Sequence, residues 1–225
     1  MFAFHEGEEL RPCMLARIAK HTGLEPKHLS VSAANFRASE IGAPTPLSYN
    51  ANEPMPRHVA FLRGVSPTNA KMPDLKRCFE HAGFTDVRTV LSSGNVVFDA
   101  SSSSLSALES NAEAAMQDVL GRSFYTVVRS SAYLRDLLAS NPFAAHDIPA
   151  GAKRVVSFLR EPRASKVSLP LTEGRATVLC MMGREVFTAY VATDQGPVFM
   201  KLIAAAFGAD VTTRTWDTVA KCASV

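Results

Sequence analysis

The sequence has no hydrophobic run of the length that crosses a membrane, which needs about 18 consecutive apolar residues. Residues 1–9 are acidic and contain no apolar core of signal-peptide length. We therefore expect a cytoplasmic protein with no membrane partner. The motifs of phosphate-binding loops, dinucleotide folds, metalloproteases and serine hydrolases are also absent from the sequence. The sequence does not decide whether the protein is an enzyme.

Cysteine and histidine are sparse and scattered, which argues against a metal centre. No two of the four cysteines form a C-x-x-C pair, and the six histidines do not cluster. Because zinc needs grouped ligands, we predict no metal site and no cofactor. The cysteines are expected to be reduced thiols packed as small apolar side chains: Cys13, Cys78, Cys180 and Cys222.

The charge is nearly balanced and unevenly distributed. The chain of 225 residues has a formal net charge of +3 and 47% hydrophobic residues, as expected of a globular protein. Residues 1–56 contain five basic and six acidic residues, whereas residues 57–225 contain 19 and 15. This excess of basic residues is too small to indicate a nucleic-acid partner by itself, although the basic core is compatible with such a partner.

Residues 39–56 contain four prolines without hydrophobic periodicity and are predicted to be a linker. Residues 1–38 before it are predicted to form a short helical N-terminal extension. Within them, Leu15–Ser30 spaces Ala, Gly and Leu as a helix-turn-helix does. Since this segment is acidic and short, the alternative is a small amphipathic appendage.

The remainder shows two similar series of elements. In residues 57–142, apolar periodicity predicts a strand, a helix, a hairpin through a two-residue turn at Ser93-Gly94, a second helix, a fourth strand and a closing helix. A capping box of Ser106 and Glu109 is expected to begin the second helix, with Val119 in its apolar stripe. Residues 153–225 repeat the order and end in a helix capped by Thr215. Residues 161–174, with two prolines, make a poor helix there.

The two series also match residue by residue. Val59-Ala-Phe-Leu-Arg63 corresponds to Val156-Ser-Phe-Leu-Arg160, and Val128-Arg-Ser130 to Thr213-Arg-Thr215. The predicted fold class is therefore α+β, with two βαββαβ ferredoxin-like halves, 57–142 and 153–225, that arose by internal duplication.

Several of these segments resemble the bacterial domain of unknown function 1697 family. They are Val59–Gly64, Lys71-Met72, Gly83-Phe84, Val87–Thr89, Ser93–Phe98 and Thr212–Val219. The resemblance implies tandem ferredoxin-like halves and implies no activity. The chain departs from the family at Gly64–Asn69, where a glycine-rich loop is replaced by one that contains Pro67, which argues against a phosphate-binding role for that loop.

Repeated arginines at strand ends are the main functional candidates. If the halves pack about a pseudo-twofold axis, these guanidiniums could meet at a phosphate or carboxylate; alternatively, they pair with local acids and carbonyls. The Ser92–Asn95 turn is the most suggestive local feature, because its hydroxyls and backbone amides could bind an anion; alternatively, Gly94 and Asn95 serve the geometry of the turn alone. We predict an anionic small molecule bound between the halves by Arg63, Ser93, Asn95, Thr213, Arg214 and Trp216. The alternatives are a nucleic-acid-binding protein and a non-catalytic structural or interaction module; the oligomeric state is not predicted.

Overall fold

The computed structural model describes residues 55–101, 104–192 and 198–225. These described residues belong to one compact unit. The predicted N-terminal extension, its helix-turn-helix-like stretch, Cys13 and nearly all of the predicted linker lie outside the described residues. Within the described part of the chain, no helix is long and apolar enough to cross a membrane.

The first half follows the predicted βαββαβ order. Its strands form an antiparallel sheet in the order β2-β3-β1-β4. The elements are β1 (Arg57–Leu62), α2 (Met72–His81), β2 (Thr85–Thr89), β3 (Asn95–Asp99), α3 (Leu105–Leu120) and β4 (Thr126–Ser130). The helix α4 (Ser131–Ser140) and a 3-10 turn (Pro142–Ala145) then lead to the second half.

The second half departs from that order. Its sheet has five strands in the order β6-β7-β8-β5-β9. The elements are β5 (Lys153–Leu159), β6 (Leu171–Glu173), β7 (Ala176–Met182), β8 (Glu185–Tyr190), α5 (Val198–Phe207), β9 (Val211–Thr215) and α6 (Trp216–Ala223). The prediction of a βαββαβ unit is wrong here, because the short strand β6 takes the place of the first helix. Pro162 and Pro170 interrupt this connection and disfavour a helix.

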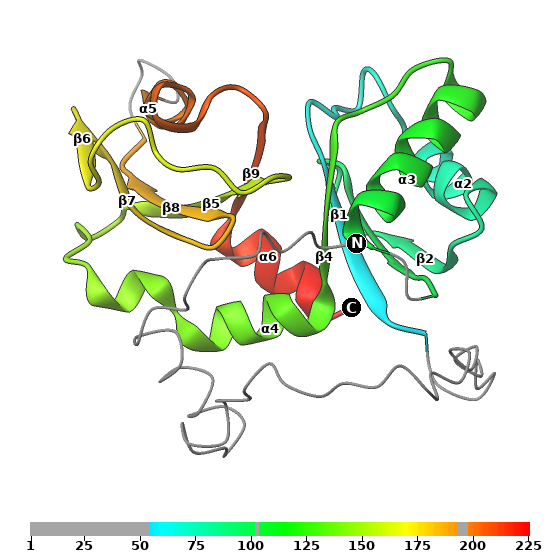
Figure 1. The fold of residues 1–225 in the computed structure, drawn as a ribbon, viewed down its shortest axis with the longest axis horizontal. Helices are drawn as coiled ribbons and strands as arrows, with labels where there is room; N and C mark the ends of the chain where they lie inside the picture. The colour runs from blue at the N-terminus through cyan, green and yellow to red at the C-terminus, as the bar shows by residue number, and fades with distance from the viewer. Residues whose placement is uncertain (1–54, 102–103, 193–197) are drawn as a thin grey trace, which may run out of the picture. The chain divides into compact units, whose positions relative to one another are not determined.

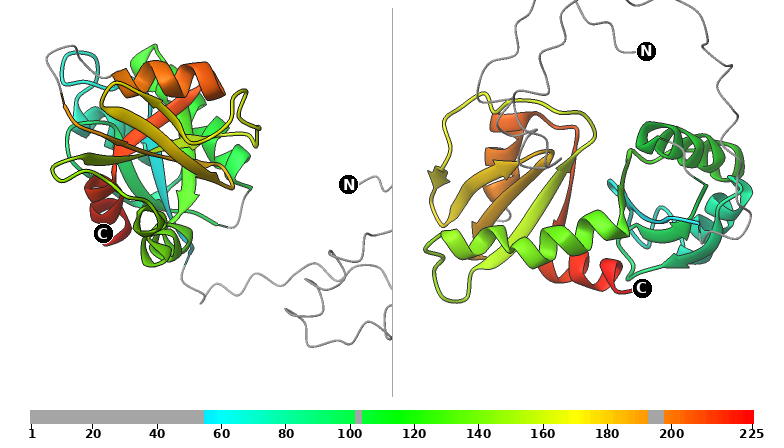
Figure 2. Two further views of the ribbon diagram at one scale, coloured as in Figure 1. Left: turned by 90° about the vertical axis from the view of Figure 1, so that its left-hand side faces the viewer. Right: turned by 60° about the horizontal axis from the view of Figure 1, so that its bottom comes forward.

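The two sheets face each other and are covered by helices on their outer faces. Alternate residues of β1 point to α2 and α3 on one side and to the second half on the other. At the centre, the ring of Phe61 stacks on that of Phe158 with centroids 4.5 Å apart. Figure 1 shows α2 and α3 beside the first sheet and α5 beside the second. Helices α4 and α6 run side by side (Figure 2) and contribute to the shared core.

The first hairpin is wider than predicted. Strand β2 ends at Thr89, and residues 90–94 connect it to β3, with a hydrogen bond of 2.9 Å from the Val90 N–H to the Asn95 carbonyl. The predicted two-residue turn at Ser93-Gly94 is therefore wrong. Gly94 is nevertheless required, since its φ is +71° and an added Cβ would lie 2.7 Å from the Cβ of Val65.

The cap of α3 also differs from the prediction. Ser104, and not Ser106, is the N-cap residue, and its hydroxyl accepts a hydrogen bond from the Ala107 N–H at 3.3 Å. Glu109 is too far along the helix to complete a capping box, and its carboxylate is directed to β4. Val119 is exposed and does not belong to the buried stripe. The prediction that Thr215 caps α6 is confirmed.

Candidate functional site

Two arginines cross between the halves. Arg129, on β4, donates from Nη2 to the carbonyl of Leu159 at 2.6 Å and from Nε to Glu185 at 2.7 Å. Arg214, on β9, donates from Nη2 to the carbonyl of Leu62 at 2.7 Å and from Nε to the Asn95 side-chain oxygen. Each guanidinium therefore binds the end of an inner strand of the other half, β5 or β1.

The strand registers show that these two sets are equivalent. On β1 and β3, Phe61 lies opposite Asn95, and on β5 and β8, Phe158 lies opposite Glu185. Arg129 lies over the ring of Phe158 at 5.7 Å, and Arg214 over that of Phe61 at 5.6 Å. The halves are thus joined by the same interaction twice, in opposite directions.

The charges at the two crossings differ. Arg129 and Glu185 are 2% and 1% exposed and form a buried ion pair. The second carboxylate oxygen of Glu185 accepts hydrogen bonds from Tyr133 and from the Arg184 N–H, and burial together with this carboxylate raises the pKa of Tyr133. Arg214 has no carboxylate partner among the described residues, and its burial lowers its pKa to about 10. It therefore stays protonated at neutral pH.

The donors of Arg214 are occupied by protein acceptors. Besides Asn95 and Leu62, they bind the Thr212 hydroxyl at 3.0 Å and the carbonyls of Thr213, Ser93 and Gly94 at 2.8, 3.0 and 3.1 Å. The structure thus brings four predicted site residues together, Ser93, Asn95, Thr213 and Arg214. They bind one another, which leaves no N–H of this guanidinium for an outside anion.

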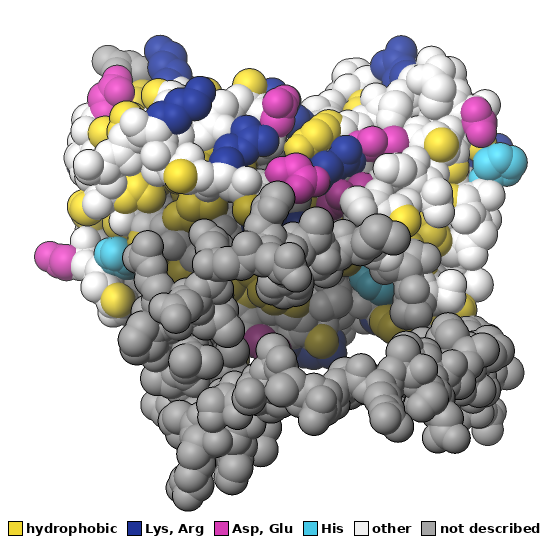
Figure 3. Space-filling view, viewed as in Figure 1, with side chains coloured by type: hydrophobic (Ala, Val, Ile, Leu, Met, Phe, Trp, Pro, Cys, Tyr) yellow, Lys and Arg dark blue, Asp and Glu magenta, His cyan; other side chains and the backbone are white. Residues whose placement is uncertain are grey.

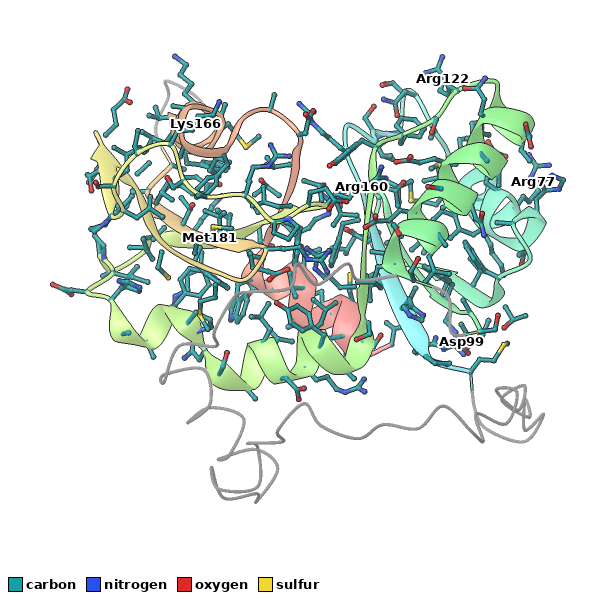
Figure 4. The ribbon with its side chains drawn as sticks, in the orientation of Figure 1. Arg77, Asp99, Arg122, Arg160, Lys166 and Met181 are labelled. Atoms are coloured by element: carbon teal, nitrogen blue, oxygen red, sulfur yellow. The ribbon has the colours of Figure 1, made fainter. Side chains whose placement is uncertain are left out.

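The free edge of β4 is closed by acidic side chains of α3. Glu113 accepts a hydrogen bond of 2.8 Å from the Thr126 N–H, and Glu109 one of 2.9 Å from the Val128 N–H. Arg160, which follows β5, forms ion pairs with both carboxylates, at 3.2 Å to Glu109. Figure 4 labels Arg160 where the halves meet, and Figure 3 shows basic and acidic side chains gathered there. Pairing of this kind satisfies the groups that an edge strand leaves open.

The free edge of β9 borders a cavity instead. The cavity has a volume of about 290 Å³ and is lined by Arg63 and Gly64 of the first half and by Val155, Tyr190, Phe199, Met200 and residues 211–215 of the second. Three predicted site residues, Arg63, Thr213 and Arg214, thus lie at one cavity. The hydroxyl of Thr213 is bound to that of Ser157 at 2.6 Å. Arg63 is exposed, and its Nη1 lies 3.9 Å from the Asp210 carboxylate.

The family assignment follows from comparison with known proteins. A family model described as Protein of unknown function (DUF1697) matches residues 55–187, which is more than half of the chain. The chain belongs to this family. A search of curated proteins found no match to the DUF1697 chain. It is similar to the solved structure of the conserved bacterial protein SP0830 from Streptococcus pneumoniae, with a TM-score of 0.52, 16% identity and coverage of 76% of this chain and 97% of that one. At this identity the likeness concerns the fold alone.

Three predicted residues of the DUF1697 chain do not line the cavity: Ser93 and Asn95, which bind Arg214, and Trp216. The ring of Trp216 packs edge-on against Phe143 and Phe187, with centroids 5.2 and 6.1 Å away, and holds α6 to the second sheet. Trp216 also borders a separate cavity of about 440 Å³ with Lys153 and Arg154. The structure therefore does not bring it to Arg63.

Metal-ligating residues of the DUF1697 chain do not gather in the described ranges. There, no three His, Cys, Asp or Glu side chains are placed to hold a metal ion. Cys78 and Cys222 are buried free thiols and Cys180 is partly buried, and burial raises the pKa of all three.

Sequence reasoning did not find the residues that close the β4 edge, Glu109 and Glu113. Their spacing of four residues on one helix face was the available signal, since residues four apart lie above one another. The strand that they contact was not evident from that spacing.

Proposed function

We propose that this protein binds a small anionic molecule, bearing a phosphate or carboxylate, in the cavity at β9 between its two halves. The proposal rests on the position of Arg63. The guanidiniums of Arg129, Arg160 and Arg214 are engaged by acids and carbonyls, whereas Arg63 borders the cavity with an ion pair of only 3.9 Å to Asp210. A partly exposed arginine in such a position has donors to offer a ligand.

The cavity walls suit a small ligand with an apolar part. Phe199 and Met200 of α5 and Tyr190 of β8 supply apolar surface beside the cation, and the rings of Tyr190 and Phe199 stack at 4.3 Å. The volume of about 290 Å³ is at the lower end of the range of small-molecule sites. Among the described residues that line this cavity, no nucleophile and base are paired, so the proposal is binding without an assigned reaction.

A thermal-shift measurement on the full chain tests the proposal. Inorganic phosphate and acetate are each added against chloride at equal ionic strength. A ligand at 100 times its Kd stabilises the folded state by about 2.7 kcal/mol. We expect at least one anion to raise Tm, and Arg63→Ala to abolish the rise while Arg122→Ala, at the C-terminal end of α3 (Figure 4), retains it. An equal rise in both variants, or none in the unmodified chain, would contradict the proposal.

The alternative of nucleic-acid binding has less support from the described residues. Recognition of RNA by a sheet face needs exposed aromatics, whereas Phe61 and Phe98 are fully buried. Addition of short oligonucleotides to the same measurement tests the alternative. An oligonucleotide response that falls with salt, as release of counterions requires, would support it.

We also propose that the chain is cytoplasmic and that residues 57–142 and 153–225 are ferredoxin-like units related by internal duplication. Two observations support this proposal. Phe61 and Phe158 have the same strand pairing in their sheets. Arg129 and Arg214 each bind a strand of the other half. Strand β6 would then be a later replacement of a helix. An interaction module without a ligand remains the third hypothesis, and the thermal-shift result above separates it from the first.

A further inference from the structure

The edge strands β4 and β9 occupy equivalent positions in their sheets. Val128 lies opposite Ala60 on β1, and Thr213 lies opposite Ser157 at the matching position on β5. The N–H of Val128 points away from β1, because it donates to Glu109. Since N–H groups alternate in direction along an antiparallel strand, the equal register directs the N–H of Thr213 away from β5.

The helices that precede these strands also correspond. Each ends at a glycine with positive φ, +68° at Gly121 after α3 and +85° at Gly208 after α5. When the two helices are aligned at these glycines, Met200 of α5 occupies the position that Glu113 occupies on α3. The alignment agrees with burial, since it pairs the buried Ala112, Ala115 and Met116 of α3 with the buried Phe199, Leu202 and Ile203 of α5.

The carboxylates of α3 therefore have no counterpart on α5. Helix α5 contains no acidic residue, and Met200 borders the cavity with 38% exposure. Arg63 follows β1 as Arg160 follows β5, and each lies at the edge strand of the other half. Arg160 forms ion pairs with Glu109 and Glu113. Beside Arg63, the cavity lies where the equivalent carboxylates would be.

We propose that the β9 cavity takes the carboxylate of a small monocarboxylate ligand, held between the Arg63 guanidinium and the Thr213 N–H. At β9 the ligand carboxylate takes the role that the side chains of Glu109 and Glu113 have at the edge of β4. This inference rests on the function proposed above and narrows it to one ligand chemistry. The apolar part of the ligand lies against Phe199 and Met200.

The local charge favours a monoanion over a phosphate dianion. Of the two arginines among the described lining residues, Arg63 has donors to spare and Arg214 is saturated, and Asp210 lies beside Arg63 with an opposing charge. A planar carboxylate can form an ion pair with the guanidinium and accept a hydrogen bond from the strand edge, as Glu109 does with Arg160 and the Val128 N–H.

Calorimetric titration of the full chain with three probes that share a phenyl ring tests the inference. The probes are benzoate, phenyl phosphate and benzamide. We expect benzoate to bind about tenfold more tightly than phenyl phosphate, and neutral benzamide not to bind. In ¹⁵N-labelled protein, benzoate should move the amide proton of Thr213 downfield. Tighter binding of phenyl phosphate that still depends on Arg63 would overturn the carboxylate inference and leave the proposed function standing. Failure of both anions to bind would refute both.

Substitution at position 200 gives a matched pair. Met200→Glu places an acid where α3 has Glu113, so it should lower benzoate affinity about tenfold or more, whereas Met200→Gln should retain it. Equal affinities in the two variants would overturn the inference.

Discussion

Arg129 and Arg214 occupy equivalent positions on the two edge strands, yet within the described part of the chain only Arg129 contacts a carboxylate. The Glu185 carboxylate accepts a hydrogen bond of 2.7 Å from Arg129 Nε, whereas the neutral side-chain amide of Asn95 accepts the hydrogen bond from Arg214 Nε. The two halves are therefore joined once by a buried ion pair and once by a buried cation with neutral acceptors.

The two crossings should differ in their response to substitution. Glu185→Gln leaves the buried charge of Arg129 without an anion, and we expect a loss of about 3–5 kcal/mol in the free energy of unfolding. Asn95→Ala leaves one donor of Arg214 unsatisfied and should cost about 1–3 kcal/mol. Equilibrium unfolding in urea, monitored on the full chain, measures both values.

Glu161→Gln is the control for this comparison, because Glu161 is an exposed acid near the same strand end. It should change the free energy of unfolding by less than about 0.5 kcal/mol. A loss in Glu185→Gln as small as that of the control would show that the ion pair does not stabilise the fold.

The two hairpin glycines offer a second comparison. Gly94→Ala combines positive-φ strain with a Cβ placed 2.7 Å from that of Val65, whereas the nearest atom to a Cβ at Gly183 is a carboxylate oxygen of Glu185 at 3.5 Å. Gly183→Ala should cost about 1 kcal/mol from strain, and Gly94→Ala clearly more. At this size 1 kcal/mol shifts Tm by about 2–4 °C, so calorimetry separates the variants. Equal losses would mean that Val65 moves away without cost.

Acid should destabilise the protein through His58. This histidine is 5% exposed and stacks on Phe98, and burial lowers its pKa below the usual 6.5, with smaller opposing effects from Pro56 and Asp99. The unfolded chain then binds more protons than the folded one as pH falls. The stabilisation is complete above the unfolded pKa and is lost as pH falls through the folded pKa.

The measurement is the free energy of unfolding between about pH 7.5 and about pH 5.5. His58→Phe keeps the ring stacking and should show a shallower loss than the unmodified chain. His81→Gln, at an exposed site on α2, serves as control and should follow the unmodified chain. Parallel profiles of His58→Phe and the unmodified chain would contradict the assignment.

The sequence predicts what depends on periodicity and local chemistry. The order of strands and helices in the first half was predicted, and the Thr215 cap was identified, because their signals lie within a few residues. The width of the first hairpin was missed, since Leu91 adopts φ +59° and apolar residues give no sequence signal for that conformation. Strand β6 was missed because the three residues directly after Pro170 form a strand only by pairing with β7.

The candidate site was only partly accessible to sequence reasoning. The repeated arginines drew attention to Arg63 and Arg214, but which guanidinium is saturated depends on atoms far away along the chain, such as Leu62 and Asn95. Trp216 was grouped with Arg214 because the two are close in sequence. On passing from β9 into α6 the chain turns, so their side chains face different neighbours.

The shared core between the sheets has a consequence for how the protein is made and altered. Val59, Phe61 and Val97 of the first sheet are covered by Val156, Phe158 and Phe187 of the second. A chain interrupted near residues 146–152 would leave each fragment with an apolar sheet face in water. We expect such fragments to be insoluble apart and to recover the fold when coexpressed, so the sequence boundary between the repeats is no boundary for cooperative unfolding.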